Sequence, residues 1–441
     1  MIFGTDGIRG IVDVSIDSKL AYKVGKAYAK YIEKHDLPKK VIVGKDTRIS
    51  GDTYFSALAS GLSDYGIDVI FVGIVSTPTI SFLLTKMNIG GGVMITASHN
   101  DFTYNGLKLF DKIGRKLSIE DEKEVEEYYK KKIRPSACKG KITFNFQIPN
   151  IYKDYLLSEC YCNLHNISIA LDCANGSNFS IAPKIYHTLG ANIIKVACNN
   201  DGKNINNDCG ANHIDRLQKE VLCHSTDFGI AFDGDGDRLR VVLSDGKILD
   251  GDDILFILAN YLKQKNKLNG LTIVGTIMTN KGLEESLKKL DISLVRCDVG
   301  DKNVINCLSQ NHYSIGGEPS GHICIYEHNT TCDALFNSLY FLKVITENKI
   351  DIHQILSKLV KYPTLLCNLE VSKDLRKNWD DNLIIKQEIK NISDMYPNCR
   401  IVVRPSGTEP MIRLYVESHS DIENEIIISR LKDIIKKYNK I

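Results

Sequence analysis

Residues 90–110, GGGVMITASHNDFTYNGLKLF, contain the pattern that most constrains the fold of this chain of 441 residues. Three glycines lead into the apolar run Val93-Met94-Ile95, which ends in the polar sequence Thr96-Ala97-Ser98-His99-Asn100. The pattern predicts a buried strand that carries a hydroxyl, an imidazole and an amide at its end, with the Lys108 amine ten residues after the serine. A serine that a rigid strand presents on a loop is a candidate nucleophile, but a hydroxyl without an activating group reacts poorly.

Predicted strands and helices alternate on the N-terminal side of this stretch. Residues 18–34 place apolar side chains at helical spacing, and residues 41–43 and 68–75 form short apolar runs typical of buried strands. This alternation predicts βαβ units on a mostly parallel sheet, with ligands near the carboxyl ends of the strands. Ser98 lies at such an end.

The same order of elements recurs along the chain, and its length suggests two to four domains. The lysine-rich stretch at 130–141 is typical of a solvated linker, and Pro363 lies near the last boundary. Ser420 and Glu423 predict a capping box at the start of a long terminal helix. We expect an α/β fold of three similar α/β domains with mixed, mostly parallel sheets plus a C-terminal α+β domain, with bounds at 1–150, 151–251, 252–363 and 364–441.

Composition excludes several classes of protein. A hydrophobic content of 43% with 25% charged residues is typical of a soluble globular protein, and the near-balanced net charge of +2 gives no basis for nucleic-acid or membrane binding. No run of roughly 18 apolar residues predicts a membrane span. The thirteen cysteines are scattered without CxxC pairs, and the N-terminus shows no signal peptide, so we expect reduced thiols and a cytoplasmic protein without a zinc site.

The sequence Asp233-Gly234-Asp235-Gly236-Asp237-Arg238 follows an apolar strand. Carboxylates at alternate positions repel one another unless a cation lies among them, and the glycines let the backbone turn all three inward. An EF-hand loop would require Gly at Arg238 and a carboxylate at Ser244, so it is excluded. A solvated acidic turn is the alternative, but the strand-end position favours a divalent metal, and three hard oxygen ligands suit Mg²⁺.

Arg404-Pro405-Ser406-Gly407-Thr408-Glu409-Pro410 links two predicted strands near the C-terminus. Ser406, Gly407 and Thr408 offer hydroxyls and backbone N–H groups, and Arg404 and Arg413 offer guanidinium forks that suit phosphate oxygens. An ordinary hairpin loop would use Gly and Ser but would not need both arginines. The pattern therefore favours phosphate binding.

Gly316-Gly317-Glu318-Pro319-Ser320-Gly321-His322 places an acid, a hydroxyl and an imidazole between glycines. Glu318, Ser320 and His322 suit recognition of sugar hydroxyls, although an ordinary Gly/Pro turn explains this stretch equally well when it is taken alone. Arg9 and the stretch 45–48 (KDTR) are weaker signals, because single cations are usually solvated.

Together these stretches supply a hydroxyl, a metal cage, a sugar-reading loop and a phosphate clamp. A metal at the three aspartates would act on a phosphoserine at Ser98, neutralising its oxygens and polarising the P–O bond. The electrophile is then phosphorus and the acceptor a sugar hydroxyl. In this interpretation His99 positions the serine and Lys108 handles the proton.

The chain resembles the α-D-phosphohexomutase superfamily over essentially its whole length, through FGTDGIRG (3–10), TASHN (96–100), DGDGDR (233–238), GEPSGH (317–322) and RPSGTEP (404–410) in the order of that family. Within the superfamily, LDCANG at 171–176 and NINNDCGA at 204–211 are most similar to the bacterial phosphoglucosamine mutases.

This resemblance implies four domains in a heart shape around a central cleft. It implies interconversion of glucosamine 6-phosphate and glucosamine 1-phosphate, toward UDP-N-acetylglucosamine, through a phosphoserine enzyme and a sugar bisphosphate. It also implies one Mg²⁺ per chain, held by phospho-Ser98 and the three aspartates. The resemblance implies that Arg9, Lys108 and Arg238 contact the transferring phosphate or assist proton transfer. It implies that Glu318, Ser320 and His322 recognise the sugar. The residues that it implies for binding the non-reacting phosphate are Arg404, Ser406, Gly407, Thr408 and Arg413.

Two positions depart from the family pattern, Asp101 where members often have Pro and Tyr104 where they often have Asp, and we expect these to change the shape of the loop. Pro319 occupies a position that differs between substrate classes, so a phosphoglucomutase or phosphomannomutase is the alternative. A metal-dependent phosphatase and a non-catalytic sugar-phosphate sensor are the alternatives from other classes, and a homodimer stays open.

Overall fold

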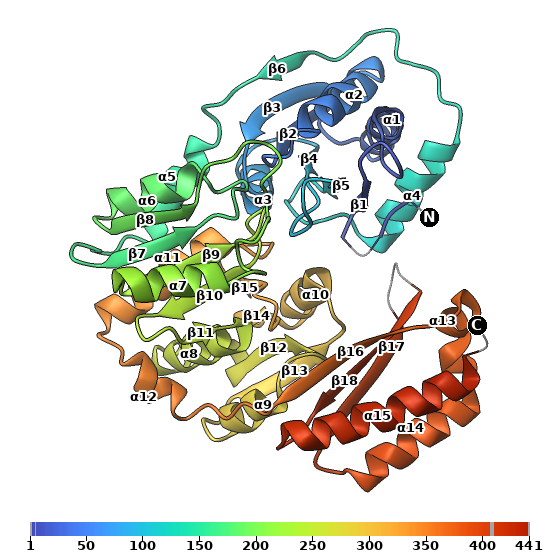
Figure 1. Cartoon of the computed structure of the whole chain (residues 1–441). Coiled ribbons are helices and arrows are strands. Elements are labelled where there is room, and N and C mark those ends of the chain that lie inside the picture. Colours follow the sequence, from blue (N-terminus) through green and yellow to red (C-terminus); the bar gives the residue numbers. More distant parts are fainter. Residues whose placement is uncertain (1, 5, 406–409, 440–441) are drawn as a thin grey trace.

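The structure is a computed structural model that describes residues 2–4, 6–405 and 410–439. In this part of the chain four sheets follow one another, each built from a separate stretch of sequence (Figure 1). The four units curve round, so that the last, which is red in Figure 1, lies beside the third and faces the first. This organisation confirms the predicted fold class. The predicted boundaries at 150, 251 and 363 stay a prediction.

The first sheet has the strand order β1-β5-β4-β2-β3-β6. Its centre is parallel (β4-β2-β3), while β1 and β5 add antiparallel strands on one side. The predicted strand before Ser98 is confirmed as β4, whose five residues are all buried. The elements of this unit are β1 (Ile8–Ile11), α1 (Ser18–Lys34), β2 (Lys40–Lys45), α2 (Gly51–Asp64), β3 (Asp68–Ile74), α3 (Thr77–Lys86), β4 (Gly91–Ile95), β5 (Tyr104–Phe110), α4 (Ile119–Lys130) and β6 (Ile142–Phe144).

The second sheet has the order β11-β10-β9-β7-β8, with β9-β7-β8 parallel and β10 returning antiparallel to β9. The aspartate-glycine stretch forms the turn between β9 and β10. The elements of this unit are α5 (Asn150–Glu159), β7 (Ser168–Asp172), α6 (Ile181–Thr188), β8 (Asn192–Ala197), α7 (Asp215–His224), β9 (Phe228–Phe232), β10 (Leu239–Leu243) and β11 (Ile248–Leu249).

The third sheet has the order β13-β12-β14-β15, in which only β15 is antiparallel to its neighbour. The predicted sugar-reading stretch forms the turn between β14 and β15. The elements of this unit are α8 (Gly251–Gln264), η1 (Asn269–Leu271), β12 (Thr272–Thr276), α9 (Lys281–Lys288), β13 (Ser293–Cys297), α10 (Asp301–Asn311), β14 (Ile315–Gly317), β15 (Ile323–Ile325), α11 (Ala334–Glu347) and α12 (Ile352–Leu356).

The fourth sheet is fully antiparallel, in the order β16-β18-β17. The terminal helix α15 begins after Ser420, but the Ser420 side chain caps nothing, so the predicted capping box is wrong; Ser420 donates its own N–H to the Ser418 hydroxyl instead. The elements are β16 (Thr364–Glu370), α13 (Lys373–Asn378), η2 (Trp379–Asp381), α14 (Leu383–Met395), β17 (Arg400–Pro405), β18 (Met411–Glu417) and α15 (Asp421–Tyr438).

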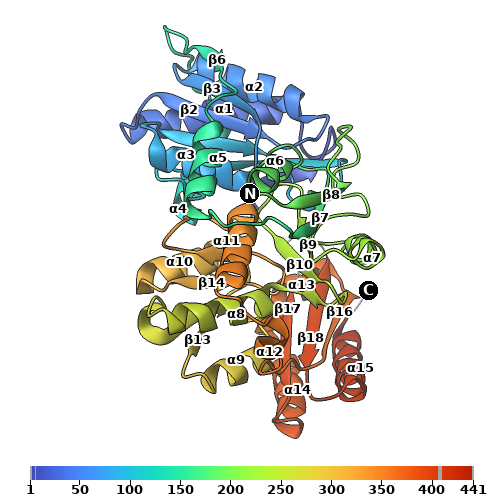
Figure 2. The same cartoon turned by 90° about the vertical axis from the view of Figure 1, so that its left-hand side faces the viewer.

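The first three units share one hydrophobic core, which contains buried residues from α3, β7, β9, α8 and α11. Helix α11 packs against β9 and β10 of the second unit and against α8 and β15 of the third, and Figure 2 shows it between these two units. The fourth unit has a separate core of its own residues. Within the described residues, no helix is both long and apolar enough to cross a lipid bilayer.

Candidate active site

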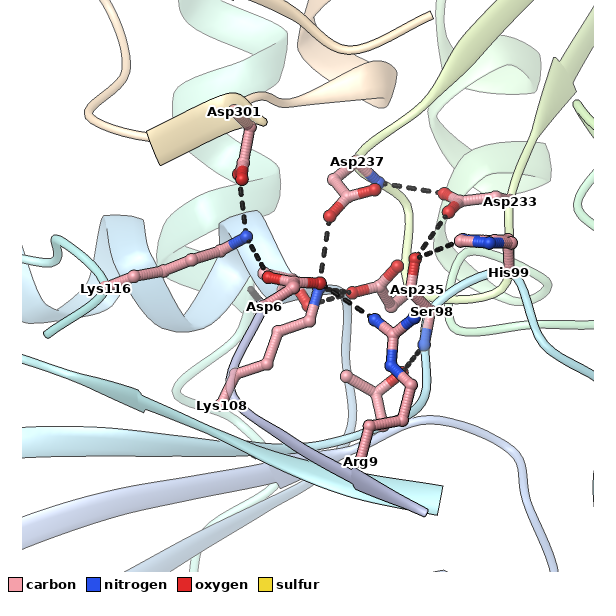
Figure 3. Close-up of polar contacts among 12 residues, drawn as sticks. Asp6, Arg9, Ser98, His99, Lys108, Lys116, Asp233, Asp235, Asp237 and Asp301 are labelled. Carbon is pink, nitrogen blue, oxygen red and sulfur yellow. Dashed lines mark hydrogen bonds and ion pairs between the residues drawn. The ribbon is translucent and has the colours of Figure 1, made fainter. Parts of the chain in front are cut away.

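Ser98 lies on the loop that follows β4, and only 1% of its surface is exposed. Its backbone adopts a left-handed conformation with φ of 52°, which is uncommon for a residue with a side chain. Its Oγ donates to Asp233 Oδ2 at 3.1 Å and lies 3.3 Å from His99 Nδ1 (Figure 3). The serine of the first unit therefore contacts the acidic turn of the second.

Two side chains hold this loop through its carbonyl oxygens. Arg48, which is fully buried, donates to Ser98 O at 3.0 Å and to Asn100 O at 2.7 Å, and Asn206 Nδ2 donates to the same two oxygens at 2.8 Å each. Asp46 balances the guanidinium charge at 2.9 Å. Arg48 also donates to the backbone carbonyls of Asp101 and Tyr104, the two residues that depart from the family pattern. The backbone at both positions is therefore held by Arg48.

The three aspartates lie in the turn between β9 and β10, and each is at most 2% exposed. Asp233 Oδ1 accepts the backbone N–H groups of Gly236, Asp237 and Arg238 at 3.1–3.2 Å, which folds the turn back on itself. Gly236 has φ of 78°, a conformation that glycine adopts without strain. One oxygen from each aspartate lies within 4.8 Å of the others.

Lys108 reaches this cluster from β5. Its Nζ lies 2.8 Å from Asp235 Oδ2, 2.9 Å from Asp6 Oδ2 and 3.2 Å from Asp237 Oδ2. Burial opposes its charge, but the three carboxylates outweigh burial and hold the pKa of Lys108 well above its usual range. Lys108 therefore keeps its proton in this arrangement, and its role in proton transfer stays a prediction.

Asp6 extends the cluster toward the third unit. Its second oxygen contacts Lys116 Nζ at 2.5 Å, and Lys116 in turn contacts Asp301, the first residue of α10, at 2.7 Å. Arg9 contacts Asp6 at 2.9 Å (Figure 3). It also donates to Asn100 Oδ1 at 3.3 Å. Asp6, Lys116 and Asp301 were not singled out in the sequence, because each becomes significant only through a partner distant in the chain.

The aspartate cluster fits a divalent cation. Burial and the nearby Asp237 and Asp235 carboxylates raise the pKa of Asp233 to about 8, although Arg238 and His322 act in the opposite direction. Asp235 Oδ1 is buried and has no hydrogen-bond partner among the residues that the structure describes. Three carboxylate oxygens with an unsatisfied acceptor among them match the hard oxygen ligands of Mg²⁺.

His99 follows Ser98 directly, and Arg238 is the last residue of the aspartate turn. Burial, with the positive charges of Arg238 and Arg9, lowers the pKa of His99 to about 3, so this imidazole is neutral. Arg238 donates to Asn212 Oδ1 at 3.2 Å. Next to His99 is a polar cavity of about 410 Å³, lined by His99, Asn100, Asp101, Asn206, Asn207, Asp208, Asn212 and His213.

The predicted sugar-reading loop contacts the aspartate turn directly. His322 Nε2 lies 3.1 Å from Asp237 Oδ1, and His322 Nδ1 lies 2.8 Å from Glu318 Oε2. Although burial opposes its charge, Asp237 and Glu318 raise the pKa of His322 to about 10, and the nearby Arg238 acts in the opposite direction. Arg238 Nε lies 3.2 Å from His322 Nε2. Gly300 N–H donates to the other Glu318 oxygen at 3.0 Å, and Ser320 Oγ lies 3.4 Å from His322 Nδ1.

Arg404 and Arg413 are direct cross-strand partners on β17 and β18. Burial and the Arg413 charge lower the pKa of Arg404, and the Glu318 carboxylate acts in the opposite direction, which places the fourth unit within electrostatic reach of the sugar-reading loop. Ser406, Gly407 and Thr408 lie outside the described residues.

Four family models match the chain in succession. They are described as domains I, II and III (alpha/beta/alpha) and the C-terminal domain of phosphoglucomutase/phosphomannomutase, and they match residues 1–135, 151–246, 250–362 and 366–433. The chain is also 38% identical to the phosphoglucosamine mutase of Clostridioides difficile, over 99% of this chain and 98% of that protein.

Two solved structures show the same fold. A phosphoglucomutase/phosphomannomutase family protein from Burkholderia thailandensis has a TM-score of 0.83 at 22% identity and covers 99% of this chain and 97% of its own. N-acetylphosphoglucosamine mutase from Aspergillus fumigatus, solved with GlcNAc-6P and magnesium, has a TM-score of 0.71 at 17% identity, with 100% and 96% of the two chains covered.

Proposed function

Since the chain belongs to the phosphoglucomutase/phosphomannomutase family, we propose that it is a phosphoglucosamine mutase, which interconverts glucosamine 6-phosphate and glucosamine 1-phosphate. The observation that carries the proposal is the contact of Ser98 Oγ with Asp233 at the edge of the buried aspartate cluster. The substrate rests on the full-length likeness to the phosphoglucosamine mutase of C. difficile.

Ser98 would act as a phosphate carrier. In one half of the reaction the P–O bond of phospho-Ser98 breaks and the phosphoryl group passes to a sugar oxygen, which gives a sugar bisphosphate. After the sugar turns over, the other phosphoryl group returns to Ser98. The burial of Ser98 supports this role, because a phosphoserine must be kept from water until the sugar arrives.

Asp233, Asp235, Asp237 and an oxygen of Ser98 would hold one Mg²⁺ per chain. When bound, this ion supplies positive charge that neutralises the phosphoryl oxygens. Lys108, fixed between Asp235 and Asp237, holds a proton and a positive charge beside the same oxygens. Arg9, which donates to Asn100 in the serine loop, and Arg238 offer further cationic donors near the site. Neutral His99 would position the Ser98 hydroxyl.

Substrate recognition would use two groups of residues. Glu318, Ser320 and His322 face the aspartate turn and would read sugar hydroxyls, while Arg404 and Arg413, with Ser406, Gly407 and Thr408, would hold the phosphate that is not reacting. A clamp that recognises only a phosphate accepts the sugar in either orientation, as the mutase reaction requires. A separate core in the fourth unit supports closure of that unit over the substrate.

The near-balanced charge of the chain supports a small-molecule partner rather than nucleic acid or a membrane. The scattered, free cysteines support a reducing compartment such as the cytoplasm. We also propose four domains with the predicted ranges 1–150, 151–251, 252–363 and 364–441. A homodimer is part of the same proposal.

The test compares turnover of glucosamine, glucose and mannose 6-phosphates by the purified protein with Mg²⁺ and a trace of the matching bisphosphate. We expect the highest kcat/KM with glucosamine 6-phosphate and no turnover by Ser98→Ala. Higher kcat/KM with glucose or mannose phosphate would favour a phosphoglucomutase or phosphomannomutase instead. Rapid release of inorganic phosphate would indicate a phosphatase, and full turnover by Ser98→Ala would refute the phosphoserine mechanism.

A further inference from the structure

Strands β7 and β8 end side by side, and a cysteine follows each of them. The two strands are parallel neighbours, and their last residues, Asp172 and Ala197, are register partners. Cys173 and Cys198 are therefore the next pair beyond the sheet. Neighbouring strands lie about 4.8 Å apart, and disulfides join Cα atoms roughly 4.4–6.8 Å apart, so the backbone spacing suits a bridge between these residues.

The two thiols lie close enough for each to shift the pKa of the other. The Cys198 thiol donates to Leu171 O, on β7, at 3.4 Å. Cys173 is fully buried, while Cys198 is partly exposed. Both are free thiols in this structure.

This arrangement gives the two thiols different reactivity. The hydrogen bonds from Cys173 lower the pKa of Cys198, although burial acts against this, whereas burial and the contact with Cys198 raise the pKa of Cys173 well above its usual range. An accessible thiol with a lowered pKa next to a second, resolving thiol is typical of cysteines that respond to oxidants.

We propose that Cys173 and Cys198 form a redox modification site, at which a low-molecular-weight disulfide converts the two thiols into an intramolecular disulfide. The Cys198 thiolate attacks one sulfur of the small disulfide and releases one thiol from it. The Cys173 thiolate then attacks the Cys198 sulfur and releases the second thiol. The protein loses two protons and two electrons, and the small disulfide gains them as two thiols.

The bridge would act on the phosphoserine loop, because the residues after Cys173 support it. Ala174 O accepts the backbone N–H of Asn206 at 2.9 Å, and Asn206 holds the carbonyl of Ser98. Asn175 O accepts the hydroxyl of Thr47 at 2.7 Å, and Ser177 N–H donates to Gly234 O, inside the aspartate turn, at 2.8 Å. A disulfide at Cys173 therefore constrains the backbone segment that supports both the serine and the aspartates.

The experiment uses the full chain with the exposed thiols removed by Cys138→Ser and Cys223→Ser, so that they form no mixed disulfides. This background protein and its Cys198→Ser and Cys173→Ser derivatives are incubated with oxidised glutathione, alkylated and mapped by mass spectrometry without reduction. We expect a peptide pair joined through Cys173 and Cys198, lighter by about 2 Da than the two free peptides, in the background protein alone. Mutase turnover, which rests on the proposed function, should fall several-fold on oxidation and recover with dithiothreitol.

Each outcome decides a separate part of the proposal. Glutathione that stays on Cys198 while Cys173 remains alkylatable would overturn the disulfide. An equal loss of turnover in Cys198→Ser would overturn its effect on the phosphoserine loop, even if the bridge is found. Because the bridge is read by mass, a failure of the proposed mutase activity would leave the disulfide result intact and would be recognised separately.

Discussion

The guanidinium of Arg48 donates directly to the backbone carbonyl of Ser98 at 3.0 Å, fifty residues along the chain. No side-chain atom of the serine takes part in this contact. Arg48 thereby fixes the uncommon left-handed backbone of Ser98 and leaves the hydroxyl to face the aspartate turn. The reactive atom is positioned through the main chain.

Replacement of Arg48 should lower both the free energy of unfolding and the rate of turnover. Arg48→Lys cannot satisfy the same set of carbonyls, and each buried acceptor left without a partner costs about 1–3 kcal/mol. A shift of the serine by about 1 Å can lower the rate roughly 100-fold. We expect kcat to fall about 10- to 100-fold, measured together with urea unfolding. Arg216→Lys, at an exposed arginine, is the matched control and should behave like wild type; unchanged kcat in Arg48→Lys would contradict the positioning role.

Removal of the metal should abolish turnover reversibly. Mg²⁺ at the three aspartates would neutralise the phosphoryl oxygens, so chelation with EDTA should reduce mutase activity by more than about 100-fold, and excess Mg²⁺ should restore it. Asp235→Asn should show the same loss without recovery at moderate Mg²⁺. Turnover that survives complete chelation, with metal content measured by mass spectrometry, would rule out this site.

Asp333 should make stability depend on pH. It is fully buried, accepts hydrogen bonds from Tyr152 and Phe336, and burial raises its pKa to about 7. The folded state therefore binds more protons than the unfolded state, whose pKa is about 3.9, so the contribution of this group falls as pH rises from about 4 to about 7.

The measurement compares urea unfolding of wild type and Asp333→Asn at pH 5 and pH 7.5. We expect the stability of the wild type relative to the variant to be lower at pH 7.5. Asp351→Asn changes an exposed N-cap of the same type and serves as the control. If the free energies of unfolding of wild type and Asp333→Asn differ by the same amount at both pH values, the assignment is refuted.

Lys116 should be important for the contact between the first and third units. It is the cation between Asp6 and Asp301. Its removal leaves the buried Asp301 carboxylate without its ion-pair partner, while Asp6 keeps its contacts with Lys108 and Arg9. Loss of one partner from a buried ion pair costs about 3–5 kcal/mol, so Lys116→Met should be destabilised by that amount in urea unfolding.

Two companion variants separate charge from packing. Lys116→Met combined with Asp301→Asn should recover part of the lost stability, since the unpaired charge of Asp301 is also removed. Lys139→Met, at an exposed lysine paired with Asp64, should change stability by less than about 1 kcal/mol. A double variant no more stable than the single one would mean that packing, not charge, dominates.

The sequence predicted the strand before Ser98 and the positions of the three loops because local signals encode them. Apolar runs followed by glycine and polar residues mark the ends of strands regardless of the rest of the fold. The helix over residues 119–130 went unpredicted because its first turn is acidic and few of its residues are apolar; its capping box uses Asp121 in place of the usual Glu or Gln.

The supports of the site could not be predicted in the same way. Arg48 looked like a solvated cation and Asn206 like a loop residue, because their partners lie 50 and 108 positions away. Asp6 contacts Lys108 and Lys116 only because the fold brings β5, the aspartate turn and α10 close together. Such residues are found from packing, since no local pattern distinguishes a buried cation from an exposed one.

The separate core of the fourth unit also bears on how the chain matures on the ribosome. Every buried residue of the shared core lies at or before Leu356, whereas the core of the fourth unit uses residues from Val371 onward. Domains generally fold as units during synthesis, N-terminal part first. We therefore expect Ser98, Lys108 and the three aspartates to come together while the fourth unit, with the phosphate-binding residues, is still being synthesised. The enzyme would become active only after the last helix has left the ribosome.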